Sequence, residues 1–223
     1  AVRRALGRTG GIGLARLGHW PAVAGYMAFA WFEIVSLAPA DPAVLARTAL
    51  VYWIAVFVLE VAEGEDWIEQ GEFLTVYFGF VSKIAPLWAD RREGSLTFRL
   101  GWPGAQIVAM APLTLSQAAF VTAVLASVSF DGLHETFWWL ARIGINPLDV
   151  PGRSAVVGVN TAGLFLTWAV MAALIAAAIR AELALSGPSA PAFAAAAGPY
   201  VLSFLPIATG YHVAHYLVAL LTS

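Results

Sequence analysis

The sequence contains no cysteine, and only 12% of its 223 residues are charged. The absence of cysteine excludes disulfides, thiolate metal ligands, cysteine-bound iron–sulfur clusters and covalently attached c-type haem. Any bound metal must therefore be held by histidine, carboxylate, amide, tyrosine, methionine or backbone groups. The net charge is −2, which provides no basic surface, so we expect no nucleic-acid partner.

The scarcity of charge accompanies a hydrophobic content of 60%. Soluble globular proteins have about 25% charged residues, so most of this chain lacks the side chains of a water-facing surface. Apolar runs of about 20 residues are long enough to cross a bilayer. We therefore predict an all-α, polytopic transmembrane helical bundle in a lipid bilayer. It comprises a basic cytoplasmic lead-in at residues 1–18 and a single transmembrane domain at 19–223. The expected spans are residues 19–38, 43–62, 104–130, 154–179 and 192–222.

Two further segments are too short or too polar to cross, and we predict that each forms an interfacial helix. The first, residues 66–88, follows an acidic stretch and has an uninterrupted apolar run of only about ten residues, half of what a span needs. The second, residues 132–145, is amphipathic and rich in tryptophan. We expect a polar loop at 89–103, an N-cap at Asp41 with Pro42 at the first helical position, and a kink at Pro112.

The basic residues predict the orientation of the chain. With five spans and a cytoplasmic N-terminus, nine of the twelve bases fall on the cytoplasmic side, as the positive-inside rule requires. We therefore expect a bacterial inner-membrane protein with its C-terminus on the periplasmic side. The chain begins without an initiator methionine, and we expect it to be either a processed chain or a piece of a longer one with spans ahead of it.

This topology places several polar side chains at the depth of the outer leaflet. Glu33 lies late in the first span, Asp131, His134 and Glu135 follow the third, and the fifth carries His212 and His215. Residues at i and i+3 share a helix face, so Asp131 with His134, and His212 with His215, can each act as a pair. Ionisable groups inside a membrane are costly and are usually functional.

Two such pairs facing each other would suit zinc, copper, iron or manganese. We therefore predict a transition-metal site with Asp131, His134, His212 and His215 as ligands, and with Glu135 or Glu33 as a further ligand or proton acceptor. Its use would be chemistry on a lipophilic substrate or handling of the metal itself.

Three alternatives stay open. The histidines can be packing residues that form hydrogen bonds, in a transporter component or in a non-catalytic accessory subunit of a larger membrane complex. A haem can take two axial histidines from different helices, here His134 with His212 or His215. A pigment can bind through a single histidine.

The segments SFDGLHETFWW (129–139) and FLPIATGYHVAHYL (204–217) resemble parts of uncharacterised multi-span bacterial membrane proteins. Those proteins pair an FDGL-type segment with a late AHY-type segment. The resemblance implies a multi-span bacterial membrane protein with further spans ahead of this region, and it carries no activity.

Overall fold

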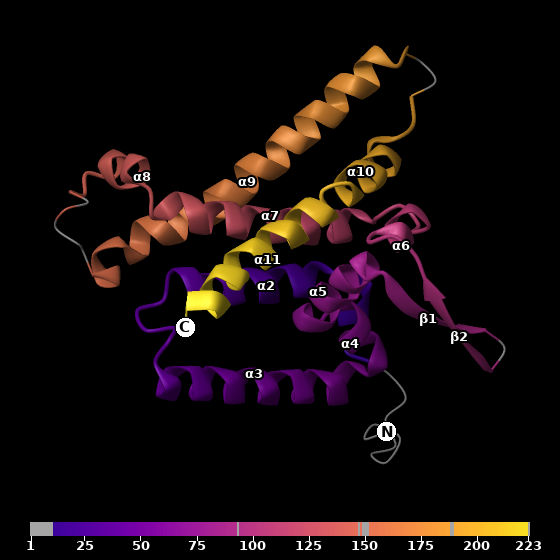
Figure 1. Ribbon diagram of the computed structural model, residues 1–223, viewed down its shortest axis with the longest axis horizontal. Helices are drawn as coiled ribbons and strands as arrows, with labels where there is room; N and C mark the ends of the chain where they lie inside the picture. The colour runs from indigo at the N-terminus through magenta and orange to yellow at the C-terminus, as the bar shows by residue number, and fades with distance from the viewer. Residues whose placement is uncertain (1–10, 93, 147, 149–151, 188–189, 223) are drawn as a thin grey trace.

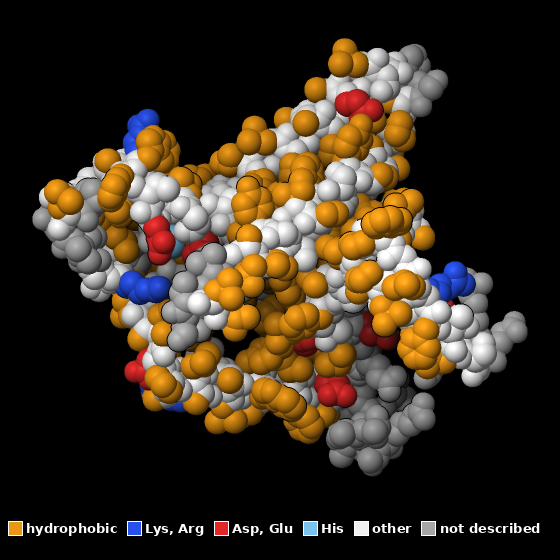
Figure 2. Space-filling model, in the orientation of Figure 1, with side chains coloured by type: hydrophobic (Ala, Val, Ile, Leu, Met, Phe, Trp, Pro, Cys, Tyr) orange, Lys and Arg blue, Asp and Glu red, His pale blue; other side chains and the backbone are white. Residues whose placement is uncertain are grey.

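The computed structural model is mostly helical, with one small two-stranded sheet (Figure 1). It describes the chain except residues 1–10, 93, 147, 149–151, 188–189 and 223. The basic lead-in is therefore seen only from residue 11, as a short 3-10 helix η1 (Leu14–Leu17). Figure 2 shows apolar side chains over most of the visible helical surface, as expected for a chain solvated by lipid.

Within the described residues, four helical segments are long and apolar enough to cross a membrane, and they indicate a membrane-embedded protein. These segments are Pro42–Glu63, Leu115–His134, Arg153–Leu185 and Phe193–Ala214. The first three are α3 (Pro42–Glu63), α7 (Leu115–His134) and α9 (Arg153–Leu185). The fourth runs through α10 (Phe193–Leu202) into α11 (Leu205–Thr222), with a break at residues 203–204.

The first predicted span, residues 19–38, contains a helix that is shorter than the apolar run. It forms α2 (Trp20–Ile34), whose 15 residues extend about 22 Å, against a hydrocarbon core of about 30 Å. This helix is nevertheless central, since it packs against α7 and against α5 (Phe73–Val81). Its buried side chains include Val23, Tyr26 and Met27. α2 is therefore a core helix whose length alone does not identify it as a span.

The third predicted span is interrupted before its middle. Residues 105–108 form the short α6 (Ala105–Val108), and regular helix resumes only at Leu115. Pro112 lies in the gap, because proline lacks the N–H that a helix interior needs. Thr114 then caps the start of α7 with a reciprocal capping box. The Thr114 hydroxyl accepts from the backbone N–H of Gln117, and the Gln117 side chain accepts from the backbone N–H of Thr114. The predicted kink is thus a complete break.

The segment after α3 differs most from expectation. The predicted interfacial helix 66–88 is divided into α4 (Glu65–Gln70), α5 and the 3-10 turn η2 (Ser82–Ile84). The predicted polar loop 89–103 is wrong, because β1 (Leu87–Arg92) pairs antiparallel with β2 (Ser95–Leu100). The second predicted interfacial helix is confined to α8 (Phe137–Arg142).

Helix α3 stands apart from the other helices (Figure 1). All its residues are described, and Glu63, its last, is the only one buried. It begins as predicted, with the Asp41 side chain accepting from the backbone N–H groups of Ala43 and Val44. An apolar groove of ≈510 Å³ separates it from α2.

Two carboxylates connect α3 to neighbouring segments, one at its last residue and one at its middle. Glu63 accepts from the backbone N–H groups of Gly13 at 3.0 Å and Ala15 at 2.8 Å. Glu72 caps α5 and also accepts from the Tyr52 hydroxyl of α3. Burial alone would raise the pKa of Glu72, but hydrogen bonds from Thr75, Tyr52 and the Leu74 backbone hold that pKa below its ordinary value.

Candidate functional site

A small polar pocket lies where α2, α7 and α11 meet. Its volume is ≈20 Å³, about enough for one water molecule. The lining combines one imidazole, one phenol, one hydroxyl and two carboxylates with three apolar side chains. These residues are Tyr26, Ala30, Glu33, Ile34, Ser127, Val128, Asp131 and His212.

A chain of hydrogen bonds runs through the wall of this pocket. The Tyr26 hydroxyl lies 2.8 Å from Ser127 Oγ and 3.2 Å from His212 Nε2. At the other side of the ring, His212 Nδ1 lies 3.0 Å from the carbonyl oxygen of Ala208. The Ser127 hydroxyl can also donate to the carbonyl of Val124, at 3.0 Å. One imidazole and two hydroxyls are thus connected between two backbone carbonyls.

Every hydrogen bond of this chain can be made in two ways, which differ by one proton on His212 and in the directions of the hydroxyl hydrogens. With neutral His212, Nδ1–H donates to Ala208, Nε2 accepts from Tyr26, and Tyr26 accepts from Ser127. With protonated His212, Nε2–H donates to Tyr26, Tyr26 donates to Ser127, and Ser127 donates to Val124. Gain of one proton therefore reverses both hydroxyl bonds while every heavy atom stays in place.

Aromatic rings hold Tyr26 in position. Its ring centroid lies 5.4 Å from that of Phe120 on α7 and 6.1 Å from that of Tyr77 on α5, distances at which aromatic pairs attract. Tyr77 also lies 5.6 Å from the His212 ring, between centroids. The side chain of Tyr26 is only 3% exposed. Three helices thus fix the hydroxyl that the imidazole faces.

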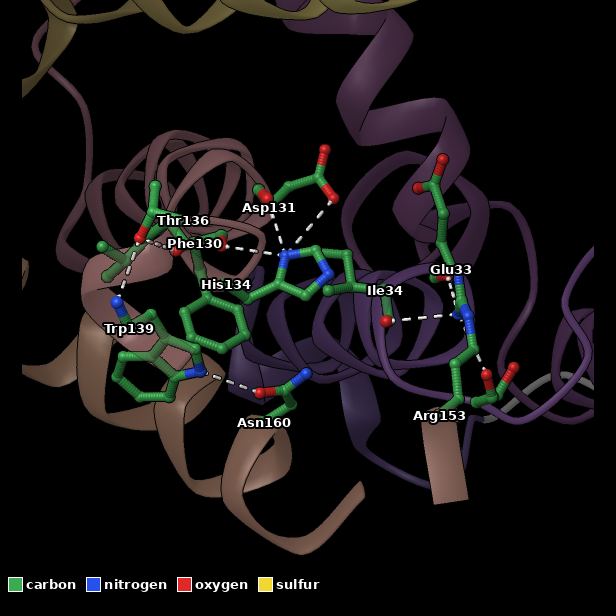
Figure 3. Close-up of polar contacts among 11 residues, drawn as sticks. Glu33, Ile34, Phe130, Asp131, His134, Thr136, Trp139, Arg153 and Asn160 are labelled. Carbon is green, nitrogen blue, oxygen red and sulfur yellow. Dashed lines mark hydrogen bonds and ion pairs between the residues drawn. The ribbon is translucent and has the colours of Figure 1, made fainter. Parts of the chain in front are cut away.

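The two carboxylates come from the ends of their helices. Glu33 is in the last turn of α2, where Arg153 of α9 donates to the carbonyls of Glu33, Ile34 and Ser36 at 3.0–3.2 Å. This guanidinium satisfies carbonyls that the helix end leaves without intrahelical partners. Figure 3 shows the Glu33 carboxylate pointing away from the guanidinium of Arg153. Asp131, near the end of α7, is half-buried.

The structure separates His134 from the pocket. Its Nδ1 lies 2.6 Å from the backbone oxygen of Asp131 and 4.0 Å from the Asp131 carboxylate (Figure 3). The His134 ring stacks on Phe130, with centroids 5.7 Å apart. The backbone oxygen therefore fixes Nδ1 as the protonated nitrogen of neutral His134. Glu135 is exposed at the end of α7 and does not line the pocket.

Of the six predicted site residues, Glu33, Asp131 and His212 line one pocket. His134 and Glu135 do not line it, and the side chain of His215 lies outside the described part of the chain. Among the described side chains, no group of three or more histidines and acids is close enough together to hold a metal ion. The predicted metal ligands are thus gathered only in part.

Tyr26 and Ser127 were not predicted as site residues. Both occupy apolar helices, where a lone hydroxyl ordinarily signals packing. Their spacing in the sequence could have indicated them. Tyr26 lies two turns before Glu33 and Ser127 one turn before Asp131, so each shares a helix face with a predicted site residue. No family model, curated protein or solved structure matches the chain.

Proposed function

We propose that this protein is the proton-carrying component of a membrane transporter, with His212 as the group that gains and loses the proton. The hydrogen-bond chain from Ser127 through Tyr26 to His212 carries this proposal. It accepts a proton without movement of heavy atoms, and histidine is the side chain whose ordinary pKa allows exchange near neutral pH.

The carboxylates support the same role. Glu33 and Asp131 face the water-sized pocket beside the imidazole. Negative charge in a medium of low dielectric must be balanced by protons or by a cation. Protonation of His212 supplies such a positive charge within the pocket. In the proposed orientation the pocket lies at the depth of the outer leaflet of a bacterial inner membrane.

The protonation of His212 can be followed directly by nitrogen NMR of histidine-labelled protein. We expect neutral His212 to carry its proton on Nδ1, and both nitrogens to be protonated on acidification. Tyr26→Phe removes the donor to Nε2 and should change the His212 ring signals alone. The matched control is Tyr211→Phe, since Tyr211 is exposed on the same helix. The proposal is contradicted if His212 stays neutral at every pH at which the protein is folded. It is also contradicted if Tyr26→Phe leaves the His212 ring signals unchanged.

A transition-metal site is the second candidate, favoured by the approach of His212, Glu33 and Asp131 to one pocket. One imidazole and two carboxylates suit manganese, iron or zinc. His215, whose side chain lies outside the described part of the chain, is the proposed fourth donor. Binding requires the carboxylates to close around the ion, because the described acids and histidines do not yet converge. The metal would serve chemistry on a lipophilic substrate or its own handling.

Metal analysis tests this candidate. If it holds, purified wild-type protein contains about one metal ion per chain, and the double variant His212→Ala with His215→Ala loses it. His19→Ala is the matched control, because His19 lies at the start of α2 and does not line the pocket. Equal metal content in the wild type and the double variant would sink the metal candidate and leave the proton proposal standing.

A further inference from the structure

The hairpin formed by β1 and β2 has one apolar and one polar face. Leu87 pairs with Leu100, Ala89 with Phe98 and Arg91 with Leu96. Since side chains alternate across a strand, these six positions share one face, and all of them except Arg91 are apolar. The other face carries Trp88 opposite Arg99 and Asp90 opposite Thr97. A hairpin patterned in this way is built to lie on an apolar surface.

The apolar face is not covered by the part of the chain that the structure describes. Leu87 is 59% exposed, Phe98 69% and Leu100 82%. Trp102, two residues after β2, and Val108, at the end of α6, are also strongly exposed. A lone two-stranded hairpin is marginal in water, and a contiguous apolar patch of this kind marks an interaction site.

The position of the hairpin fits the edge of a membrane. It projects from the end of the bundle at which α3 ends and α7 and α10 begin (Figure 1). Helix ends of membrane proteins lie at the interface between hydrocarbon and headgroups. Tryptophan, here Trp88 and Trp102, is enriched at that level. The base of the hairpin therefore emerges where headgroups are expected.

Charge further specifies the partner. Residues 83–102 contain four bases, Lys83, Arg91, Arg92 and Arg99, against two acids, Asp90 and Glu93, a net charge of +2. Arg99 pairs with Asp90 at 2.6 Å on the polar face, which leaves the excess positive charge to the other bases. Basic segments next to a bilayer are attracted to anionic lipids.

We propose that the hairpin is a membrane-surface anchor, whose apolar face enters the interfacial layer while the net positive charge of residues 83–102 attracts anionic lipid headgroups. The inference goes beyond the proposed function, because it concerns neither His212 nor any proton. It also explains why the leucines of the hairpin and Phe98 lie on one face.

Spin labels on the two faces test the anchor. The chain has no cysteine, so Phe98→Cys and Thr97→Cys each create one labelling site, on opposite faces of β2. In nanodiscs of phosphatidylcholine and phosphatidylglycerol, a label at 98 should meet dissolved oxygen more often than a water-soluble nickel chelate. A label at 97, the matched control, should show the reverse. The ratio of the label's collision rate with oxygen to that with the nickel chelate is expected to differ severalfold between the two sites.

Two other outcomes overturn the proposal. If both labels meet the nickel chelate equally, the face lies in water. If the label at 98 is shielded from both reagents, a protein surface covers it instead of lipid. In nanodiscs of phosphatidylcholine alone, the label at 98 should become more accessible to the chelate, and an unchanged ratio overturns the role of anionic headgroups. Thermal unfolding of each labelled protein checks that it remains folded.

Discussion

Replacement of Phe130 by alanine is expected to lower the free energy of unfolding by about 3 kcal/mol. Phe130 is fully buried in α7. Its ring meets Trp139 edge to face, with centroids 5.5 Å apart, and stacks on His134. It also fills the space beside Gly163 of α9, where an added Cβ would lie 2.5 Å from the Phe130 ring. Its loss opens a cavity where three helices meet.

The expected loss of stability lies near the lower end of the range for replacing a buried phenylalanine by alanine, because the unfolded helices remain in lipid. Transfer of a ring between lipid and protein interior gains little, whereas the empty space and the lost contacts cost fully. Equilibrium unfolding in mixed detergent micelles measures the difference. Phe137→Ala is the matched control, since Phe137 is 72% exposed on α8. Equal destabilisation by the two substitutions would contradict this account of the core.

Much of the helical pattern could be predicted because lipid imposes a simple rule on composition. A run of apolar residues must be helical in a bilayer, since its backbone groups have no water to bond. Start signals such as Asp41 with Pro42 are local and were predicted correctly. The exact length of α2 was not, because its apolar sequence continues beyond the point where Arg153 of a distant helix caps it.

The hairpin was missed because charge was given more weight than alternation. Residues 96–100, Leu-Thr-Phe-Arg-Leu, alternate between apolar and polar types, which is the ordinary signal of a strand. Gly94, with a φ of +83°, lies in the turn between the strands, where a positive φ suits glycine. The three arginines of the segment indicated a polar loop instead. The alternation of apolar and polar residues, rather than the charge of the segment, indicated its secondary structure.

The sequence could predict which residues lie at the same depth in the membrane, but not in which direction their side chains point. The predicted topology puts Glu33, Asp131 and His212 at one level, and in the structure these three line one pocket. Asp131 and His134 share a helix face, yet only Asp131 reaches the pocket, because His134 turns its Nδ1 back to its own helix. Side-chain direction of this kind depends on tertiary neighbours such as Phe130 and Trp139, which the spacing of residues does not reveal.

The largest functional effect is expected from His212→Phe. Phenylalanine keeps a ring of similar shape but removes both nitrogens, so the Tyr26 hydroxyl loses its proton acceptor. A positioned acid–base group contributes about 10²–10⁴-fold to a proton-transfer step. We therefore expect the protein-dependent movement of protons to slow by about 100-fold or more. Vesicles that contain the reconstituted protein and an entrapped pH-sensitive dye measure this rate after a pH jump.

The matched control is His19→Phe, which makes the same chemical change outside the pocket and should keep the wild-type rate. Thermal unfolding of both variants separates a lost proton site from a lost fold. A rate for His212→Phe equal to that of the wild type would exclude His212 as the carrier. A wild-type rate no faster than that of protein-free vesicles would exclude proton carriage altogether. Ser127→Ala should have a smaller effect, because His212 keeps its hydrogen bond to Tyr26, and only the bond between Tyr26 and Ser127 at the far end of the chain is lost.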